Sequence, residues 1–215
     1  MRDFKGSMEN NPKGDPGAAM LKLTVEADQV PGFFPFLQKG VRVEAKTGCS
    51  VKGFLRDQLH MNPDYIEERV QTCFLDGKAV DDIESAMIRQ GSTLTLSGAM
   101  PGLLGATLRK GSYYASMRDQ ISHKEKMGLC DSGDGYVILK LFNLIIREVG
   151  PDLLMRGVWI EGKDLEDFMN GQGEVFRKKL KDASHNDEPI KWDRLMNLGH
   201  REGVVFLQVR VDSET

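Results

Sequence analysis

The residues best suited to bind a charged ligand lie in one passage, LTLSGAMPGLLGATLRKG. Gly98, Gly102 and Gly105 surround an expected strand-to-helix turn, and Arg109 and Lys110 follow at the expected end of that helix. Backbone N–H groups at a helix start bind anions, and glycines let a ligand approach the backbone closely. One interpretation is therefore an anion or ligand cradle made by these five residues.

The same glycines also suit close packing. Their spacing matches neither the dinucleotide-binding fingerprint nor the P-loop, since no Lys-Ser or Lys-Thr follows the last glycine. A glycine inside a helix costs about 1 kcal/mol relative to alanine, which a close helix contact at Gly102, Gly105 and Ala106 would offset. The sequence favours packing, and the cradle is kept as the alternative.

A second candidate site is an aromatic cluster, Phe33, Phe34 and Phe36. Exposed aromatic side chains anchor protein interfaces, so the three predict a partner-binding patch. The competing interpretation, which the sequence favours, is that the loop folds these rings back over the open end of a sheet.

The sequence predicts no catalytic residue, metal site or cofactor. The four histidines are dispersed, and no Cys-x-x-Cys or His-x-x-x-His pair provides metal ligands. The segment CDSGDG lacks the glutamate that a calcium loop needs at its twelfth position. Cys130 in this segment is the best candidate nucleophile, but no base is identifiable beside it.

Composition narrows the class of protein. The 215 residues carry a net charge of −3 with a pI near 5.9, which predicts no nucleic-acid partner. No apolar run approaches the roughly 18 residues that span a bilayer, so no membrane association is expected. Three cysteines without close pairing and an N-terminus without a secretory signal predict a reduced, cytoplasmic location. Residues 1–20 are expected to be a disordered lead.

The elements that would position the first candidate site follow this lead. Leu21–Ala27 and Val41–Ala45 alternate apolar and polar residues and are expected to pair as a hairpin. Ser50 is expected to cap a helix that Pro63 ends. Asp76-Gly77 predicts a tight turn between two strands, and STLTLSG is the closing strand.

This order of elements is the β-grasp plan. The segments TGCSVKGFLRDQL, CFLDGKAVDD and IRQGSTLTLSGAMPG resemble the helix, hairpin and final strand of the small sulfur-carrier proteins of molybdopterin and thiamine synthesis. The resemblance covers residues 21–102 and implies a ubiquitin-like domain. Those carriers end in Gly-Gly with a reactive carboxylate, whereas this chain has Ser97-Gly98 and Pro101-Gly102 and continues. A carrier role would need cleavage near Gly102.

The rest of the chain is expected to form a helical connector and turn, residues 103–135, and a second α+β domain, residues 136–215. Tyr136–Pro151 predicts a buried helix. VWIEGKDLEDF then echoes CFLDGKAVDDI, each after an expected helix that ends at a Pro-Asp pair. A degenerate repeat and a chance recurrence of acid-Gly-Lys turns both explain the echo.

Together these observations predict a two-part α+β protein with a protein partner, acting as a non-catalytic interaction or accessory protein. One alternative is a sulfur-carrier-like assembly protein activated by cleavage near Gly102. Another is a small-ligand binder or enzyme with its site between the two halves, near Gly98–Gly105.

Overall fold

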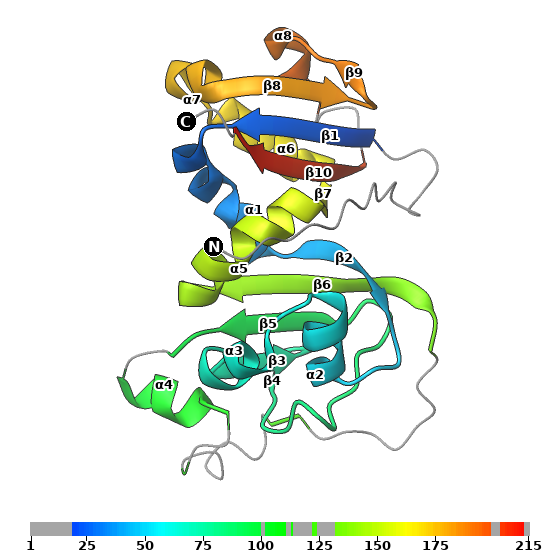
Figure 1. The fold of residues 1–215 in the computed structure, drawn as a ribbon, viewed down its shortest axis with the longest axis vertical. Coiled ribbons are helices and arrows are strands. Elements are labelled where there is room, and N and C mark those ends of the chain that lie inside the picture. Colours follow the sequence, from blue (N-terminus) through cyan, green and yellow to red (C-terminus); the bar gives the residue numbers. More distant parts are fainter. Residues whose placement is uncertain are drawn as a thin grey trace.

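The computed structural model describes residues 19–99, 102–110, 113, 122–123, 132–198 and 203–212. These residues build the predicted α+β architecture around one mixed sheet of ten strands, in the order β4-β3-β5-β6-β2-β7-β10-β1-β8-β9 (Figure 1). The strands are β1 (Ala19–Val25), β2 (Val41–Lys46), β3 (Thr72–Leu75), β4 (Lys78–Ala79), β5 (Thr93–Ser97), β6 (Asp134–Phe142), β7 (Val158–Glu161), β8 (Leu180–His185), β9 (Glu188–Pro189) and β10 (Val204–Val211). The helices are η1 (Ala27–Phe33), α1 (Phe34–Lys39), α2 (Val51–Gly53), the π-helical η2 (Phe54–Gln58), α3 (Pro63–Glu68), α4 (Gly102–Leu108), α5 (Asn143–Arg156), α6 (Gly162–Asn170), α7 (Glu174–Lys179) and α8 (Trp192–Leu195).

Strands β1 and β2 do not form the expected hairpin, so this prediction was wrong. β1 runs parallel to β10 and antiparallel to β8, whereas β2 pairs with β6 and β7. Alternating apolar residues identify a half-buried strand but not its neighbour. The connection between the two strands forms η1 and α1 instead of a turn, and carries the chain from one part of the sheet to the other.

The helix expected at Tyr136–Pro151 was wrong in its first half. Residues up to Phe142 form β6, with Val137, Leu139 and Leu141 fully buried. β6 lies between β5 and β2 in the middle of the sheet, and such strands read as continuous apolar runs that a buried helix also shows. Asn143, with φ of +54°, begins α5 where the strand ends.

Two groups of four strands have the same pairing pattern. In β3-β5-β6-β2 the neighbours are antiparallel, parallel and antiparallel. In β7-β10-β1-β8 they are antiparallel, parallel and antiparallel again. The groups meet where β2 pairs with β7 at Arg42 and Trp159. We call them the first unit (β3-β5-β6-β2) and the second unit (β7-β10-β1-β8).

The helix cap and the tight turn that the sequence predicted are both present, because each depends on residues close together in the chain. The Ser50 side chain accepts a hydrogen bond from the N–H of Gly53 and caps α2 as expected. Asp76 and Gly77, with φ of +51° and +76°, make the tight turn between β3 and β4. Both residues adopt the left-handed conformation that this turn requires.

The two Pro-Asp pairs do not end helices. Pro63 occupies the first turn of α3, after Asn62 as N-cap, where a missing N–H costs nothing. Pro151 lies inside α5, which continues to Arg156. The acid-Gly-Lys segment at Glu161 also differs from its counterpart at Asp76, because it begins helix α6 rather than a turn.

Candidate functional site

A pocket of about 310 Å³ opens at the carboxyl ends of two neighbouring parallel strands, β5 and β6. Ligands of sheet proteins commonly bind beyond the carboxyl ends of parallel strands, where loops diverge. The lining residues come from α3 and the segment after it, the end of β5, the end of α4 and the start of α5. They are Glu68, Arg69, Gln71, Gly98, Ala99, Arg109 and Leu144.

The backbone at Gly98 lies close to the start of α5. A Cβ atom on Gly98 would be 3.6 Å from the Leu144 Cβ and 3.8 Å from the Leu144 nitrogen. The N-cap of α5, Phe142, supplies no side-chain hydrogen bond to the helix. The first turn of this 14-residue helix therefore adds its partial positive charge to the pocket wall.

A polar contact ties the ends of β5 and β6 together next to the pocket. The Asn143 Nδ2 atom donates a hydrogen bond to the Ser97 Oγ atom over 2.7 Å. Across β3 and β5, Thr72 pairs with Ser97 in register, and its hydroxyl oxygen is buried without a hydrogen-bond partner in the part of the chain that the structure describes. These polar groups stand next to the lining residues Gly98 and Leu144 in the chain.

Glu148 on α5 positions one of the two pocket arginines. Its carboxylate accepts a hydrogen bond from the Tyr65 hydroxyl over 2.7 Å and forms an ion pair with Arg69. The Tyr65 bond and then the Arg69 guanidinium hold the pKa of Glu148 below its usual value. Burial, followed by the bond to Glu148, raises the pKa of Tyr65. Glu148 therefore links Arg69 to Tyr65 at the edge of the pocket.

The charges that line the pocket favour an anion. Among the described residues that line it are two arginines and one glutamate, Glu68, so guanidinium groups are the main charged donors there. Arginine presents five N–H donors, and the ion pair with Glu148 leaves some of those of Arg69 able to reach a ligand. Arg109 comes from the residue after α4 and approaches the pocket from a separate element. Planar guanidinium groups match carboxylate and phosphate oxygens in geometry.

The structure separates the five residues of the predicted cradle. Gly98 and Arg109 are among the described residues that line the pocket, while Gly102 and Gly105 lie in α4. The Lys110 side chain is directed to the backbone of α3.

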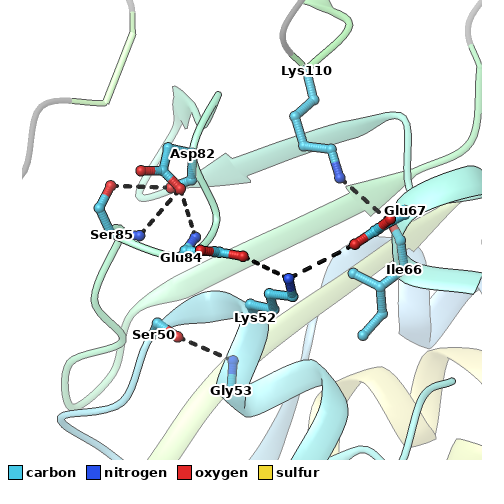
Figure 2. A network of polar contacts seen from close by, with 9 residues as sticks. All are labelled: Ser50, Lys52, Gly53, Ile66, Glu67, Asp82, Glu84, Ser85 and Lys110. Atoms are coloured by element: carbon cyan, nitrogen blue, oxygen red, sulfur yellow. Dashed lines mark hydrogen bonds and ion pairs between the residues drawn. The ribbon is translucent and has the colours of Figure 1, made fainter. Parts of the chain in front are cut away.

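Figure 2 shows the Lys110 side chain pointing to α3, where its Nζ atom donates to the Ile66 carbonyl oxygen over 3.4 Å. Its N–H donates to the Gln71 carbonyl oxygen over 2.8 Å, and burial lowers the pKa of its side chain. Beside it, Lys52 bridges Glu84 at 2.6 Å and Glu67 at 3.8 Å (Figure 2). Lys110 therefore fastens the end of α4 to α3, next to a network that joins surface segments.

The aromatic cluster folds back over the core, the interpretation that the sequence favoured. Phe33 and Phe36 are 0% and 5% exposed, and Phe34 is partly buried. The Phe168 ring lies 4.8 Å from that of Phe33 and 5.1 Å from that of Phe36, between ring centres. Phe33 and Phe36 therefore belong to the interior, while Phe34 keeps part of its surface exposed.

Several predictions concern residues outside the described ranges. These are residues 1–18 of the expected lead, most of the connector after Lys110, and the candidate nucleophile Cys130. Of the other cysteines, Cys73 is fully buried, and burial raises its pKa to about 12. Within the described ranges, no cluster of three metal-binding side chains occurs, and no helix has the length and apolar character to cross a membrane.

Sequence reasoning missed Arg69, Gln71 and Leu144. They lie far along the chain from Gly98, and no local motif connects them to it. Comparisons with protein-family models, with curated proteins and with solved structures gave no match. The functional proposal therefore depends on the geometry and charge of the pocket.

Proposed function

We propose that the chain is a non-catalytic binding protein that holds a compact anionic group, a carboxylate or a phosphate, in the pocket beside Gly98. The observation that carries this proposal is the convergence of Arg69 and Arg109, from separate elements, on one pocket at the carboxyl ends of β5 and β6. The proposal follows the ligand-binding alternative from the sequence, because Gly98 and Arg109 of the predicted cradle both line the pocket.

Binding would use groups that are already in place. Arg69 is restrained by Glu148, so little side-chain entropy is lost when it meets a ligand. The uncapped start of α5 offers backbone N–H groups to negative charge. Leu144, with 49% of its surface exposed, gives the rim an apolar contact for the rest of the ligand.

Isothermal titration with pyrophosphate and with succinate tests the proposal at low ionic strength. Charge-assisted hydrogen bonds contribute roughly 1.5–3 kcal/mol, so Arg69→Gln and Arg109→Gln should each weaken binding about tenfold or more. Arg177→Gln is the matched control, because this arginine lies on α7, pairs with Glu174 and does not line the pocket. Binding that is equally strong in all three variants would contradict the proposal, as would failure of both probes to bind the parent.

A second function, a protein-interaction module, is supported by the strand pattern of the first unit. Its central parallel pair, β5 and β6, with antiparallel neighbours on both sides, fits the β-grasp plan that residues 21–102 resemble. In this proposal β6 takes the place expected for Leu21–Ala27, and an acidic group of a protein partner occupies the pocket. The matching pattern of the second unit supports a degenerate repeat.

Affinity purification from native cells tests this function with the parent chain and Arg69→Gln in parallel. A partner that the parent retains and the variant loses supports an interaction through the pocket. A partner retained equally by both would remove the pocket from the interaction. Intact-mass measurement of the native protein tests the carrier alternative, which requires a chain that ends near Gly102.

A further inference from the structure

The first described segment of the chain, Ala19–Lys39, inserts its strand into the second unit, although the next strand in the chain belongs to the first unit. We call this segment, which comprises β1, η1 and α1, the N-terminal arm. Its strand lies between β10 and β8 and pairs with both along its length. The next strand, β2, belongs to the first unit. Figure 1 shows β1 beside β8 and β10, and β2 beside β6.

The charged residues of the arm form ion pairs with the segment that contains α6, α7 and β8. In the described residues, each ion pair of the arm joins it to a residue between 164 and 187. These pairs are Lys22–Asp187 at 2.5 Å, Lys39–Asp164, Asp28–Lys179, Glu26–Lys179 at 3.6 Å and Glu26–Lys181 at 2.7 Å. The N–H of Met20 also donates to the Asn186 side chain over 2.8 Å.

Apolar contacts fasten the helical part of the arm. The Phe33 ring packs between Phe168 of α6 and Phe176 of α7, with ring centres 4.8 and 6.0 Å away. Helix α1 also packs on β6 of the first unit and on α5, where the Leu37 side chain would lie 3.0 Å from a Cβ atom on Gly150. All of these partners follow the arm in the chain.

A single glycine joins the arm to the first unit. Gly40 has φ of +121°, a conformation that other residues rarely adopt, and β2 begins at the next residue. Its N–H donates to the Phe36 carbonyl oxygen over 2.9 Å and closes the end of α1. A change of backbone conformation at this residue would redirect the whole arm.

The position between β10 and β8 that β1 occupies, which we call the slot, has a counterpart in the first unit. There β6 lies between β5 and β2, as β1 lies between β10 and β8. Both inserted strands carry Leu-Lys-Leu, and the leucines Leu21, Leu23, Leu139 and Leu141 are at most 1% exposed. In each unit, the inserted strand is far in sequence from both of its neighbours. The two inserted strands share the same short pattern of buried leucines.

We propose that the arm is exchanged between two copies of this chain, with the arm of each copy filling the slot between β8 and β10 of the other. Every partner of the arm named above lies beyond Gly40, so a second copy supplies the same contacts. Only the conformation at Gly40 differs between the two states. Exchange of an identical element is a low-cost route to a dimer.

Concentration decides which state is populated. A segment on a short connection meets its own slot at an effective concentration of about 1 mM, so the closed monomer dominates at micromolar concentration. Refolding at about 1 mM or above should yield the exchanged dimer. Gly40→Pro removes the N–H that closes α1 and fixes φ near −65°, so it should dimerise at a concentration at least about tenfold lower.

The test uses the full chain with Lys22→Cys and Gln208→Cys, register partners on β1 and β10. Equal amounts of ¹⁵N-labelled and unlabelled chains are unfolded together, refolded at high concentration, separated by size and oxidised. Peptide mapping then identifies the crosslink apart from the native cysteines. Exchange predicts that about half of the crosslinked peptides in the dimer fraction combine one labelled and one unlabelled partner.

The control pair is Arg42→Cys with Ile138→Cys, partners on β2 and β6 that stay within one copy. Its crosslinks should contain a single isotope in the same fraction. A dimer whose β1–β10 crosslinks are all of one isotope would overturn the proposal. A chain that stays monomeric after refolding at millimolar concentration would overturn it as well, whether or not Gly40→Pro folds.

Discussion

Glu148 connects the ionisation of one side chain to the shape of the pocket. Its carboxylate holds both Tyr65 and Arg69, and these contacts lower its pKa in the folded chain. A carboxyl with a lowered folded pKa stabilises the fold above its unfolded pKa, and that stability is lost as pH falls through the folded value. The pocket and the acid stability of the chain therefore depend on the same residue.

Glu148→Gln should consequently flatten the acid limb of the stability profile. Below the ordinary pKa of 4.5, the free energy of unfolding of the parent should fall more steeply with decreasing pH than that of the variant. Urea unfolding at several values from pH 7 to about pH 3 measures this difference. Glu188→Gln, on the exposed strand β9, serves as control and should keep the parental slope. Parallel profiles for parent and Glu148→Gln would show that the contact does not stabilise the fold.

Gly157 is a position where the backbone excludes any side chain. It has φ of +100°, and a Cβ atom there would lie 2.2 Å from the Phe206 Cζ atom. Gly157→Ala should lower the free energy of unfolding by about 1–3 kcal/mol, measured from the urea midpoint. Gly133→Ala is the control: its new Cβ meets open space and its backbone lies outside the left-handed region, so it should leave the free energy of unfolding unchanged or raise it by about 0.4–1 kcal/mol. Similar midpoints for the two variants would contradict this packing.

At the scale of elements, β1 and β6 are predicted to contribute equally to stability. Leu23 and Leu141 are 1% and 0% exposed in equivalent slots, so Leu23→Ala and Leu141→Ala should each cost about 2–5 kcal/mol. Lys22→Ala changes the outward face of β1 and should cost much less. Urea unfolding compares the three. A cost well below 1 kcal/mol for Leu23→Ala would mean that β1 does not close the second unit.

Elements show where sequence reasoning succeeds and where it stops. The Ser50 cap and the Asp76-Gly77 turn were predicted because each depends on atoms a few residues apart. The alternation in β1 predicted a strand, but its partner β10 lies at the other end of the chain. Distance in sequence limits the prediction of the pocket in the same way. Gly98 and Arg109 share one passage, so the sequence could group them, whereas Arg69 reaches the same pocket only through the fold.

At the scale of the whole molecule, charge is distributed unevenly. The chain has a net charge of −3, yet two of its arginines are among the described residues that line one pocket. The proposed anion site is therefore a local feature that the composition of the whole chain does not indicate. The two units meet in one continuous sheet, and the pocket lies in the first unit while the arm closes the second.

The most direct test of the central claim, an anion site beside Gly98, is an NMR titration of the ¹⁵N-labelled chain with pyrophosphate. Backbone amides report where a ligand binds without any substitution. The account predicts saturable shifts that concentrate on Gln71, Gly98, Ala99 and Leu144 and that disappear in Arg69→Gln. Shifts spread over surface lysines, or none at the pocket at millimolar pyrophosphate, would contradict it.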